Sequence, residues 1–205
     1  GQFFERGQAD LTPFFNFHPW LYLFLVPAVS MRLWSEERKS GSIELLLTLP
    51  IQLWETVLAK FLAGWVFTGC ALLGTVPLWL TLSYLGEPDH GVILSSYLGS
   101  WMMAGAFLAI GGCVSALTKS QIIAFIVTGS VCLLFVLAGF PLVLNFFNGW
   151  VAQWILDTVA GLSVLNHFVA ITRGVVSLED ALYFASVMAL WLYLTVLALE
   201  AKRAE

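Results

Sequence analysis

The apolar residues of this chain come in long, almost uninterrupted blocks, and this pattern constrains the fold more than any other feature. Hydrophobic residues make up 60% of the 205 residues, whereas only 11% are charged. A soluble domain carries roughly 25% charged residues, because its surface faces water. A helix of about 20 apolar residues matches the thickness of a bilayer. The chain is therefore predicted to be an all-α polytopic membrane protein.

Five apolar blocks are predicted to be transmembrane helices. A helix is the expected form, because lipid cannot satisfy the backbone groups of an open strand. In chain order, the predicted spans are residues 19–33, 61–85, 96–117, 122–144 and 181–199. Pro27 and Pro77 lie inside the first two spans and are expected to kink them.

Within the third predicted span, small residues recur at helical spacing. Gly105, Ala109 and Cys113 follow one another every four residues. Small residues at this spacing let helices approach closely. We favour packing within the subunit over a seam between two copies as the reason for them.

Residues 145–177 are also apolar, but polar and charged residues interrupt them. A charge such as that of Asp157 or Arg173 at the centre of a transmembrane helix costs about 2.5–3.5 kcal/mol. Trp150 and Trp154 fall on one helical face, as aromatic residues do at a membrane interface. This segment is therefore predicted to form one or two helices that lie in the interface or re-enter the membrane.

The basic residues predict an orientation, because loops rich in Lys and Arg stay in the cytoplasm. With five spans, Arg6 and Arg173 lie on one side of the membrane. The other side, predicted to be cytoplasmic, holds Arg32, Arg38, Lys39, Lys60, Lys119, Lys202 and Arg203. Counting residues 145–177 as a sixth span would move the last two outside and weaken this bias.

The sequence contains no recognisable catalytic or metal-binding motif. Lys119 and Ser120 follow Thr118, where a phosphate-binding loop requires glycine. The three histidines lie far apart in the sequence and lack the spacing of metal ligands. The predicted spans hold almost no ionisable residues, and this disfavours an ion-coupled carrier. A membrane component driven by a partner is favoured over an enzyme.

The polar segment between the first two predicted spans is the strongest candidate for a functional site. It opens with four consecutive charged residues: Glu36, Glu37, Arg38 and Lys39. Residues 42–49 then have the pattern of a short helix that starts at Ser42 and ends at Pro50. The apolar face of this helix consists of Ile43, Leu46 and Leu47. Spacing alone leaves two interpretations open: a knob that fits a groove on a soluble partner, or an interfacial helix on lipid headgroups.

The run SEERKSGSIELLLTLPI, followed by ETVLAKFLAG, resembles the cytoplasmic segment of ABC-2 type transporter permeases. The runs ADLTPFFNFHPWLYLFLVPAVSMRLW, LTKSQIIAFI and LNHFVAITRGVVSLEDALYF resemble the same family, so that the resemblance covers nearly the whole chain. Its nearest branch is that of permeases associated with gliding motility and related exporters. The resemblance implies a single ABC-2 transmembrane domain, type V exporter-like, over residues 1–205 in a bacterial cytoplasmic (inner) membrane.

In this family a coupling helix inserts into a cleft of the ATP-binding subunit, and the resemblance places that helix within residues 35–49. The residues implied to contact the partner are Glu36, Glu37, Arg38, Lys39, Ser40, Gly41, Ile43, Glu44, Leu46 and Leu47. Family members have six spans, so we expect an N-terminal helix and a first span to be missing from these residues.

The family also carries re-entrant helices on the outer side, before the last span. In this chain they correspond to residues 145–177. The residues singled out there are Trp154, Asn166, His167 and Arg173. His167 and Arg173 are expected to pair locally with Asp180 or Glu179, in preference to orienting a lipid or an anionic cargo.

The resemblance implies no cofactor on this chain, because ATP and Mg²⁺ bind to the partner ATPase. Two copies of that subunit are expected, with a second permease that is identical or paralogous, and an auxiliary subunit with an external domain in gliding-type systems. The predicted function is that of a non-enzymatic permease subunit of an ATP-driven exporter. Two alternatives stay open: a non-transporting scaffold or signalling subunit of the same fold, and a secondary transporter.

Overall fold

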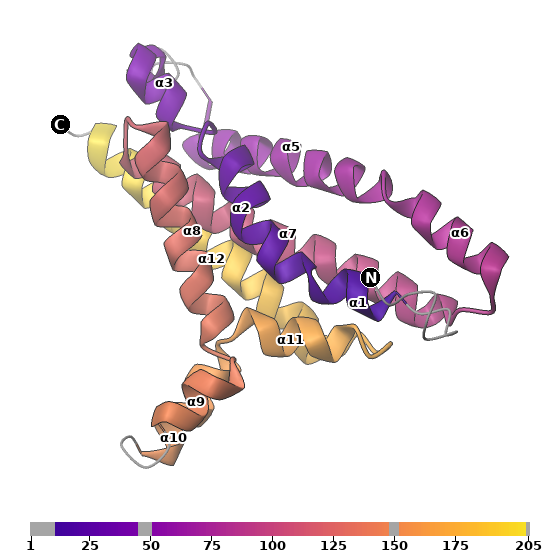
Figure 1. Cartoon of the computed structure of the whole chain (residues 1–205). Helices are drawn as coiled ribbons and strands as arrows, with labels where there is room; N and C mark the ends of the chain where they lie inside the picture. Colours follow the sequence, from indigo (N-terminus) through magenta and orange to yellow (C-terminus); the bar gives the residue numbers. More distant parts are fainter. Residues whose placement is uncertain (1–10, 45–50, 148–151, 204–205) are drawn as a thin grey trace.

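The computed structural model describes residues 11–44, 51–147 and 152–203, and these residues form α-helices and their connections without any β-strand. The predicted all-α class is confirmed. The helices are α1 (Thr12–Asn16), α2 (His18–Ser30), α3 (Ser35–Ser40), α5 (Leu53–Leu73), α6 (Val76–Leu85), α7 (His90–Leu117), α8 (Gln121–Leu137), α9 (Pro141–Phe147), α10 (Gln153–Gly161), α11 (Val164–Ile171) and α12 (Leu178–Arg203). Figure 1 shows their arrangement.

Helix α7 forms the centre of the bundle. All of its residues from Met103 to Ala116 are buried, and α2, α5, α8, α11 and α12 all pack against it. A Cβ atom at Gly105 would lie 2.7 Å from both the Met188 sulfur and the Trp65 indole nitrogen. The small residues of α7 therefore serve close packing within the chain, as expected.

Three helical segments of the described chain are long and apolar enough to cross a membrane: Leu53–Leu85, His90–Leu117 and Leu178–Ala201. Helices α10 and α11, bent by 59° at the break between them, would count as a fourth if they form one broken span. Helix α2 has 13 residues and α8 has 17, both shorter than the roughly 20 of a full span. Each predicted span thus has a helix, and the number of crossings stays a prediction.

Some helix boundaries differ from the expected ones, because a capping box or a proline sets where the helix begins or ends. Helix α5 begins at Leu53, eight residues before the predicted start, because Gln52 and Glu55 form a capping box there. The chain breaks after Leu73, and α6 starts with Pro77 in its first turn, as a proline inside the predicted span requires. Helix α8 ends at Leu137, and Pro141 then opens α9.

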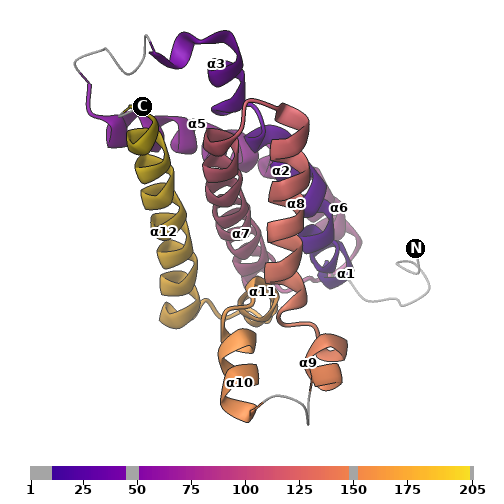
Figure 2. The same cartoon turned by 90° about the vertical axis from the view of Figure 1, so that its left-hand side faces the viewer.

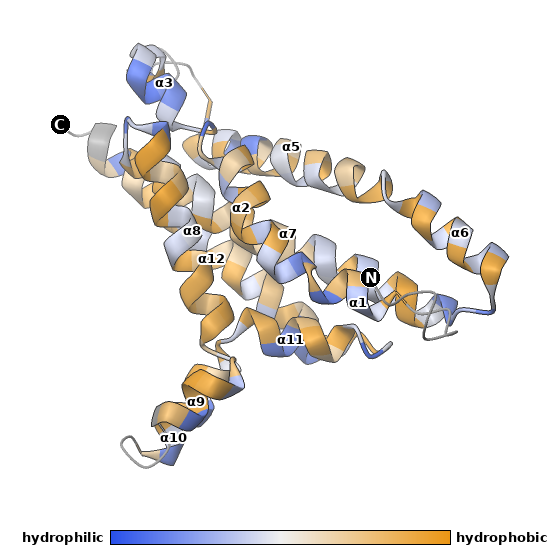
Figure 3. Ribbon diagram, in the orientation of Figure 1, coloured by the Kyte–Doolittle hydropathy of each residue, from blue (hydrophilic) through white to orange (hydrophobic). Residues whose placement is uncertain are grey.

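The two ends of the bundle carry different segments. One end holds α3, the start of α5, the α7–α8 turn and the end of α12, whereas the other holds α1, the α6–α7 loop and α11 (Figures 1 and 2). The first end, which we call the basic end, includes Arg32, Arg38, Lys39, Lys60 and Lys119. Figure 3 shows that α3 is hydrophilic, whereas the long helices are mostly apolar. The fold therefore gathers the basic residues that were expected to share one side.

Candidate coupling surface

Helix α3 consists of the charged run itself. Glu36 and Glu37 lie in its first turn and Arg38 and Lys39 in its last, an order that suits the helix dipole. Gly41 follows with φ 77°, the left-handed conformation that commonly ends a helix at glycine.

Helix α3 lies within residues 35–49, where the resemblance places the coupling helix, whereas the helix inferred from spacing alone started only at Ser42. Residues 42–44 are helical as well. Residues 45–50, which include the predicted contacts Leu46 and Leu47, lie outside the described residues. We call α3 and residues 42–44 together the coupling segment.

The hydroxyl of Ser115, on α7, joins α2 to α3. Ser115 is fully buried, and its Oγ accepts hydrogen bonds from the backbone nitrogens of Trp34 and Ser35, each at 3.0 Å. It donates to the carbonyl oxygen of Met31 at 3.0 Å. Helix α3 has no capping side chain of its own. Ser115 therefore satisfies backbone amides that the start of a helix leaves free.

Arg38 makes a contact in the opposite direction, from α3 to α7. Its guanidinium donates to the carbonyl oxygen of Ala116 at 2.7 Å, in the last turn of α7. The helix dipole favours a cation at this C-terminal end of a helix. Ala116 also lies in a small buried apolar cluster with Trp34, Val57 and Leu199. The coupling segment thus rests on both polar and apolar contacts.

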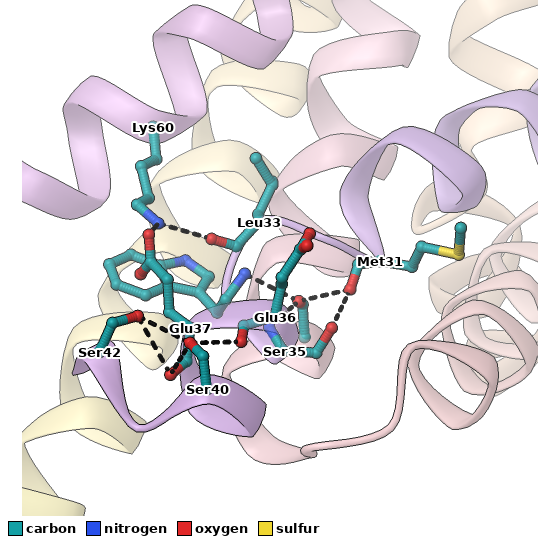
Figure 4. Close-up of polar contacts among 10 residues, drawn as sticks. Met31, Leu33, Ser35, Glu36, Glu37, Ser40, Ser42 and Lys60 are labelled. Atoms are coloured by element: carbon teal, nitrogen blue, oxygen red, sulfur yellow. Dashed lines mark hydrogen bonds and ion pairs between the residues drawn. The ribbon is translucent and has the colours of Figure 1, made fainter. Parts of the chain in front are cut away.

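Lys60, on α5, holds the coupling segment from the other side. Its ammonium pairs with the carboxylate of Glu37 and donates to the carbonyl oxygen of Leu33 at 2.7 Å (Figure 4). It also lies 4.3 Å from the centre of the Trp34 ring, within the range of a cation–π contact. A residue that the sequence marked only as one of the basic set therefore belongs to the site.

The predicted charged contacts divide into two groups by exposure. Glu37 and Arg38 are half-buried and bind within the chain, as described above. Glu36, Lys39 and Glu44 are exposed, and no ion pair or side-chain hydrogen bond from the rest of the described chain engages their charges. Three charges of both signs are therefore free to meet a partner.

The uncharged members of the predicted set shape the coupling segment. The Ser40 hydroxyl contacts the carbonyl oxygen of Glu36 at 3.0 Å and the hydroxyl of Ser42 at 2.9 Å, and so closes the end of α3 (Figure 4). Ile43 is half-buried and packs against the apolar cluster around Trp34. These residues fix the shape of the segment. Its exposed charges face away from the bundle and can contact a partner.

An open hollow of about 420 Å³ lies beside the coupling segment, between it and α5. Its lining includes Arg32, Glu36, Glu37 and Lys60. The hollow therefore combines charges of both signs next to the exposed face of α3.

At the other end of the bundle, the break between α10 and α11 is held by side chains. The carbonyl oxygens of residues 160, 161 and 162 each accept a side-chain hydrogen bond, from Asn166, His167 and Tyr183 at 2.9, 3.0 and 2.5 Å, respectively. Irregular backbone at membrane depth requires such partners. The break is therefore suited to a re-entrant position, although its depth stays a prediction.

His167 also binds α12. Its Nδ1 lies 2.6 Å from Oδ1 of Asp180, whose other oxygen accepts from the Ser177 hydroxyl at 2.6 Å. The expected local pairing of His167 is found with Asp180. Arg173 and Trp154 are exposed and lie apart from this network.

Sequence reasoning missed the residues that position the coupling segment. Ser115 lies 80 residues from Ser35, and no pattern marks a serine in an apolar helix as a cap for another helix. Lys60 offered a signal, because it is a single cation near the start of an apolar block, but its partners are set by packing.

The two comparisons that found a match both point to transport proteins. A family model described as "ABC-2 family transporter protein" matches residues 20–201. Heme exporter protein B of Rhodobacter capsulatus is 32% identical over 102 residues, which represent 45% of this chain and 45% of that protein. The match thus spans less than half of this relative's length. No solved structure matches the chain.

Proposed function

The chain belongs to the ABC-2 family of transporter membrane proteins, and on this premise we propose that it is the permease subunit of an ATP-driven exporter in a bacterial cytoplasmic membrane. A separate ATP-binding subunit, in two copies, supplies the energy by binding and hydrolysing ATP with Mg²⁺. A second permease, identical or paralogous, completes the transport path. The need for it follows from α7, whose residues Met103–Ala116 fill the centre of this bundle with buried side chains.

The observation that carries the proposal is the exposed charge on a firmly anchored helix. Glu36, Lys39 and Glu44 project from a segment that Ser115 and Lys60 hold against the bundle. Mixed charge at the rim of an interface is typical of protein partners. An anionic lipid surface would attract basic residues and repel the two glutamates. The distribution therefore favours a protein partner over the interfacial alternative.

In the proposed mechanism, ATP-driven closure of the two partner subunits moves the coupling segment of each permease. A partner can shift a conformational equilibrium only through its different affinity for the two states. Reversal from 1:99 to 99:1 requires about 5.5 kcal/mol of such a difference. Because the coupling segment is bonded to α5 and α7, its displacement must change how these helices pack.

The branch and the cargo are further parts of the proposal. The charged run of α3 supports the gliding-motility branch, for which co-purification of a subunit with a large external domain would be evidence. The relative found in Rhodobacter capsulatus carries a different name, heme exporter protein B. We therefore propose heme as the first cargo for flux measurements in sealed vesicles.

The proposal is tested by charge reversal on the exposed face of α3. We expect Glu36→Lys combined with Lys39→Glu to weaken binding of the ATP-binding subunit roughly tenfold, because reversed charges face their former partners. Binding is measured by titration of the purified subunit onto the permease in nanodiscs, together with ATPase stimulation. Glu179→Lys, on exposed residue 179 at the opposite end, is the matched control. Equal affinity in all three proteins would show that this face is not the docking surface.

A further inference from the structure

Helices α3 and α7 cap each other, although they lie far apart in the sequence. Ser115 of α7 accepts hydrogen bonds from two backbone amides at the start of α3, and Arg38 of α3 donates to the carbonyl oxygen of Ala116 in the last turn of α7. We propose that the coupling segment and α7 form one rigid unit, so that a movement imposed on α3 enters the bundle through α7. In this scheme Ser115 is a positioning residue for coupling. That a partner imposes the movement rests on the function proposed above.

The Ser115 hydroxyl is fully used by this junction. A serine hydroxyl offers one donor and two acceptor sites, and all three are engaged, by Met31, Trp34 and Ser35. The side chain is buried, so water cannot replace it. Buried amides without a partner are costly. Any separation of α3 from α7 therefore leaves both backbone amides unsatisfied.

The attachment of α3 to α5 is of a different kind. Lys60 and Glu37 form an ion pair whose side chains are 23% and 29% exposed. Partly exposed ion pairs contribute little and are screened by salt. The contacts to α7 use buried backbone groups and lie next to the apolar cluster of Trp34 and Ala116. Of the two attachments, the one to α7 is therefore the more resistant to an applied force.

Helix α7 is also in the position to pass a movement on. It packs against α2, α5, α8, α11 and α12, whereas α3 packs less extensively, mainly against α7 and α8. A Cβ atom at Gly111 would overlap the Ser30 side chain, so α2 and α7 are closely packed at this crossing. A tilt of α7 must therefore displace its neighbours together.

The rigid unit is tested by measuring a distance between α3 and α7. Spin labels are placed at two exposed positions away from the three docking charges, Ser42 of the coupling segment and Leu117 of α7, in the whole chain with its three cysteines replaced by alanine. We expect one narrow distance distribution in nanodiscs. It should not change when the ATP-binding subunit is added with a non-hydrolysable ATP analogue. A shift of this distance on addition of subunit and nucleotide would overturn the proposal.

Ser115→Ala removes the junction and leaves the rest of α7 in place. We expect the distribution to broaden, with a loss of transport per ATP hydrolysed of at least roughly tenfold, because the buried backbone amides of Trp34 and Ser35 both lose their acceptor. Ser96→Ala is the matched control, because the buried Ser96 hydroxyl donates to the carbonyl oxygen of Val92 within α7 and, among the residues that the structure describes, bonds to no other helix. A distribution in Ser115→Ala as narrow as that in Ser96→Ala would overturn the proposal.

The two proposals fail separately. The distance in the chain without a partner tests only the mutual capping of α3 and α7. If the ATP-binding subunit neither binds nor stimulates, the proposed function fails while the narrow distribution persists. If the subunit binds with unchanged affinity to Ser115→Ala but transport per ATP is unchanged too, docking stands and the role of Ser115 is wrong.

Discussion

At the scale of single residues, the contacts that hold this bundle depend on small side chains placed at helix crossings. Gly111 lies where α2 crosses α7, and the side chains of Ser30 and Thr128 occupy the space that its own side chain would need. Ser115 lies one turn further along the same helix and turns its hydroxyl to the chain break before α3. One helix therefore combines close packing and capping within a few residues.

Gly111→Ala tests the packing at this crossing. The added methyl group must push α2 away from α7, and overpacking of this kind costs about 1–3 kcal/mol. Thermal unfolding in detergent should therefore shift to lower temperature. Gly161→Ala is the control, because a Cβ atom there meets nothing within 4 Å. Equal stability of the two variants would contradict the crossing described for α2 and α7.

At the scale of elements, the break between α10 and α11 shows how an irregular segment is stabilised. The three carbonyl groups at the end of α10 accept hydrogen bonds from α11 and α12. The His167 ring stacks on Tyr183, with the ring centres 3.9 Å apart, and binds Asp180. The bend is therefore fixed by α12, and α10 beyond it extends away from the bundle together with α9 (Figure 2).

Tyr183→Phe removes one of these three bonds while keeping the ring. The carbonyl of Leu162 then lacks its side-chain donor, which costs about 1–3 kcal/mol if no water replaces it. We expect faster amide hydrogen exchange in α11. Tyr193→Phe, on the same helix but 61% exposed, should leave exchange unchanged. If Tyr183→Phe exchanges like the unmodified protein, the clamp does not hold the bend.

At the scale of the whole molecule, the fold separates a basic end from an end with the α10–α11 bend. Arg32, Arg38, Lys39, Lys60 and Lys119 come from four separate parts of the sequence and meet at one end. The positive-inside rule assigns such an end to the cytoplasm. The coupling segment lies at this end, where the proposed ATP-binding subunit would reach it from the cytoplasm.

Single-cysteine labelling tests this orientation. In a background without native cysteines, Lys39→Cys should react with a membrane-impermeant maleimide only from the cytoplasmic side. Glu179→Cys should react only from the outside, because exposed residue 179 lies at the opposite end of α12. Right-side-out and inverted vesicles separate the two sides. Labelling of Lys39→Cys from outside would exclude docking of a cytoplasmic partner on α3.

The amino-acid sequence by itself determined the class of the protein and pointed to the charged run that is its candidate coupling surface. Long apolar blocks, the helix break at Pro77 and the charged run at Glu36–Lys39 act within one helix or one bilayer thickness, so they can be read along the chain. The family resemblance rests on the same local runs, and the match over residues 20–201 confirms it.

Only the tertiary structure decided which charges are free and which are bound. Glu37 and Arg38 belong to the same run as Glu36 and Lys39, yet they bind Lys60 and Ala116 within the chain. Ser115 and Ser35, 80 residues apart, meet because α7 ends beside the start of α3. Such contacts depend on how helices cross, and crossings are set by the packing of many side chains at once. A local pattern in the sequence therefore cannot predict these long-range contacts.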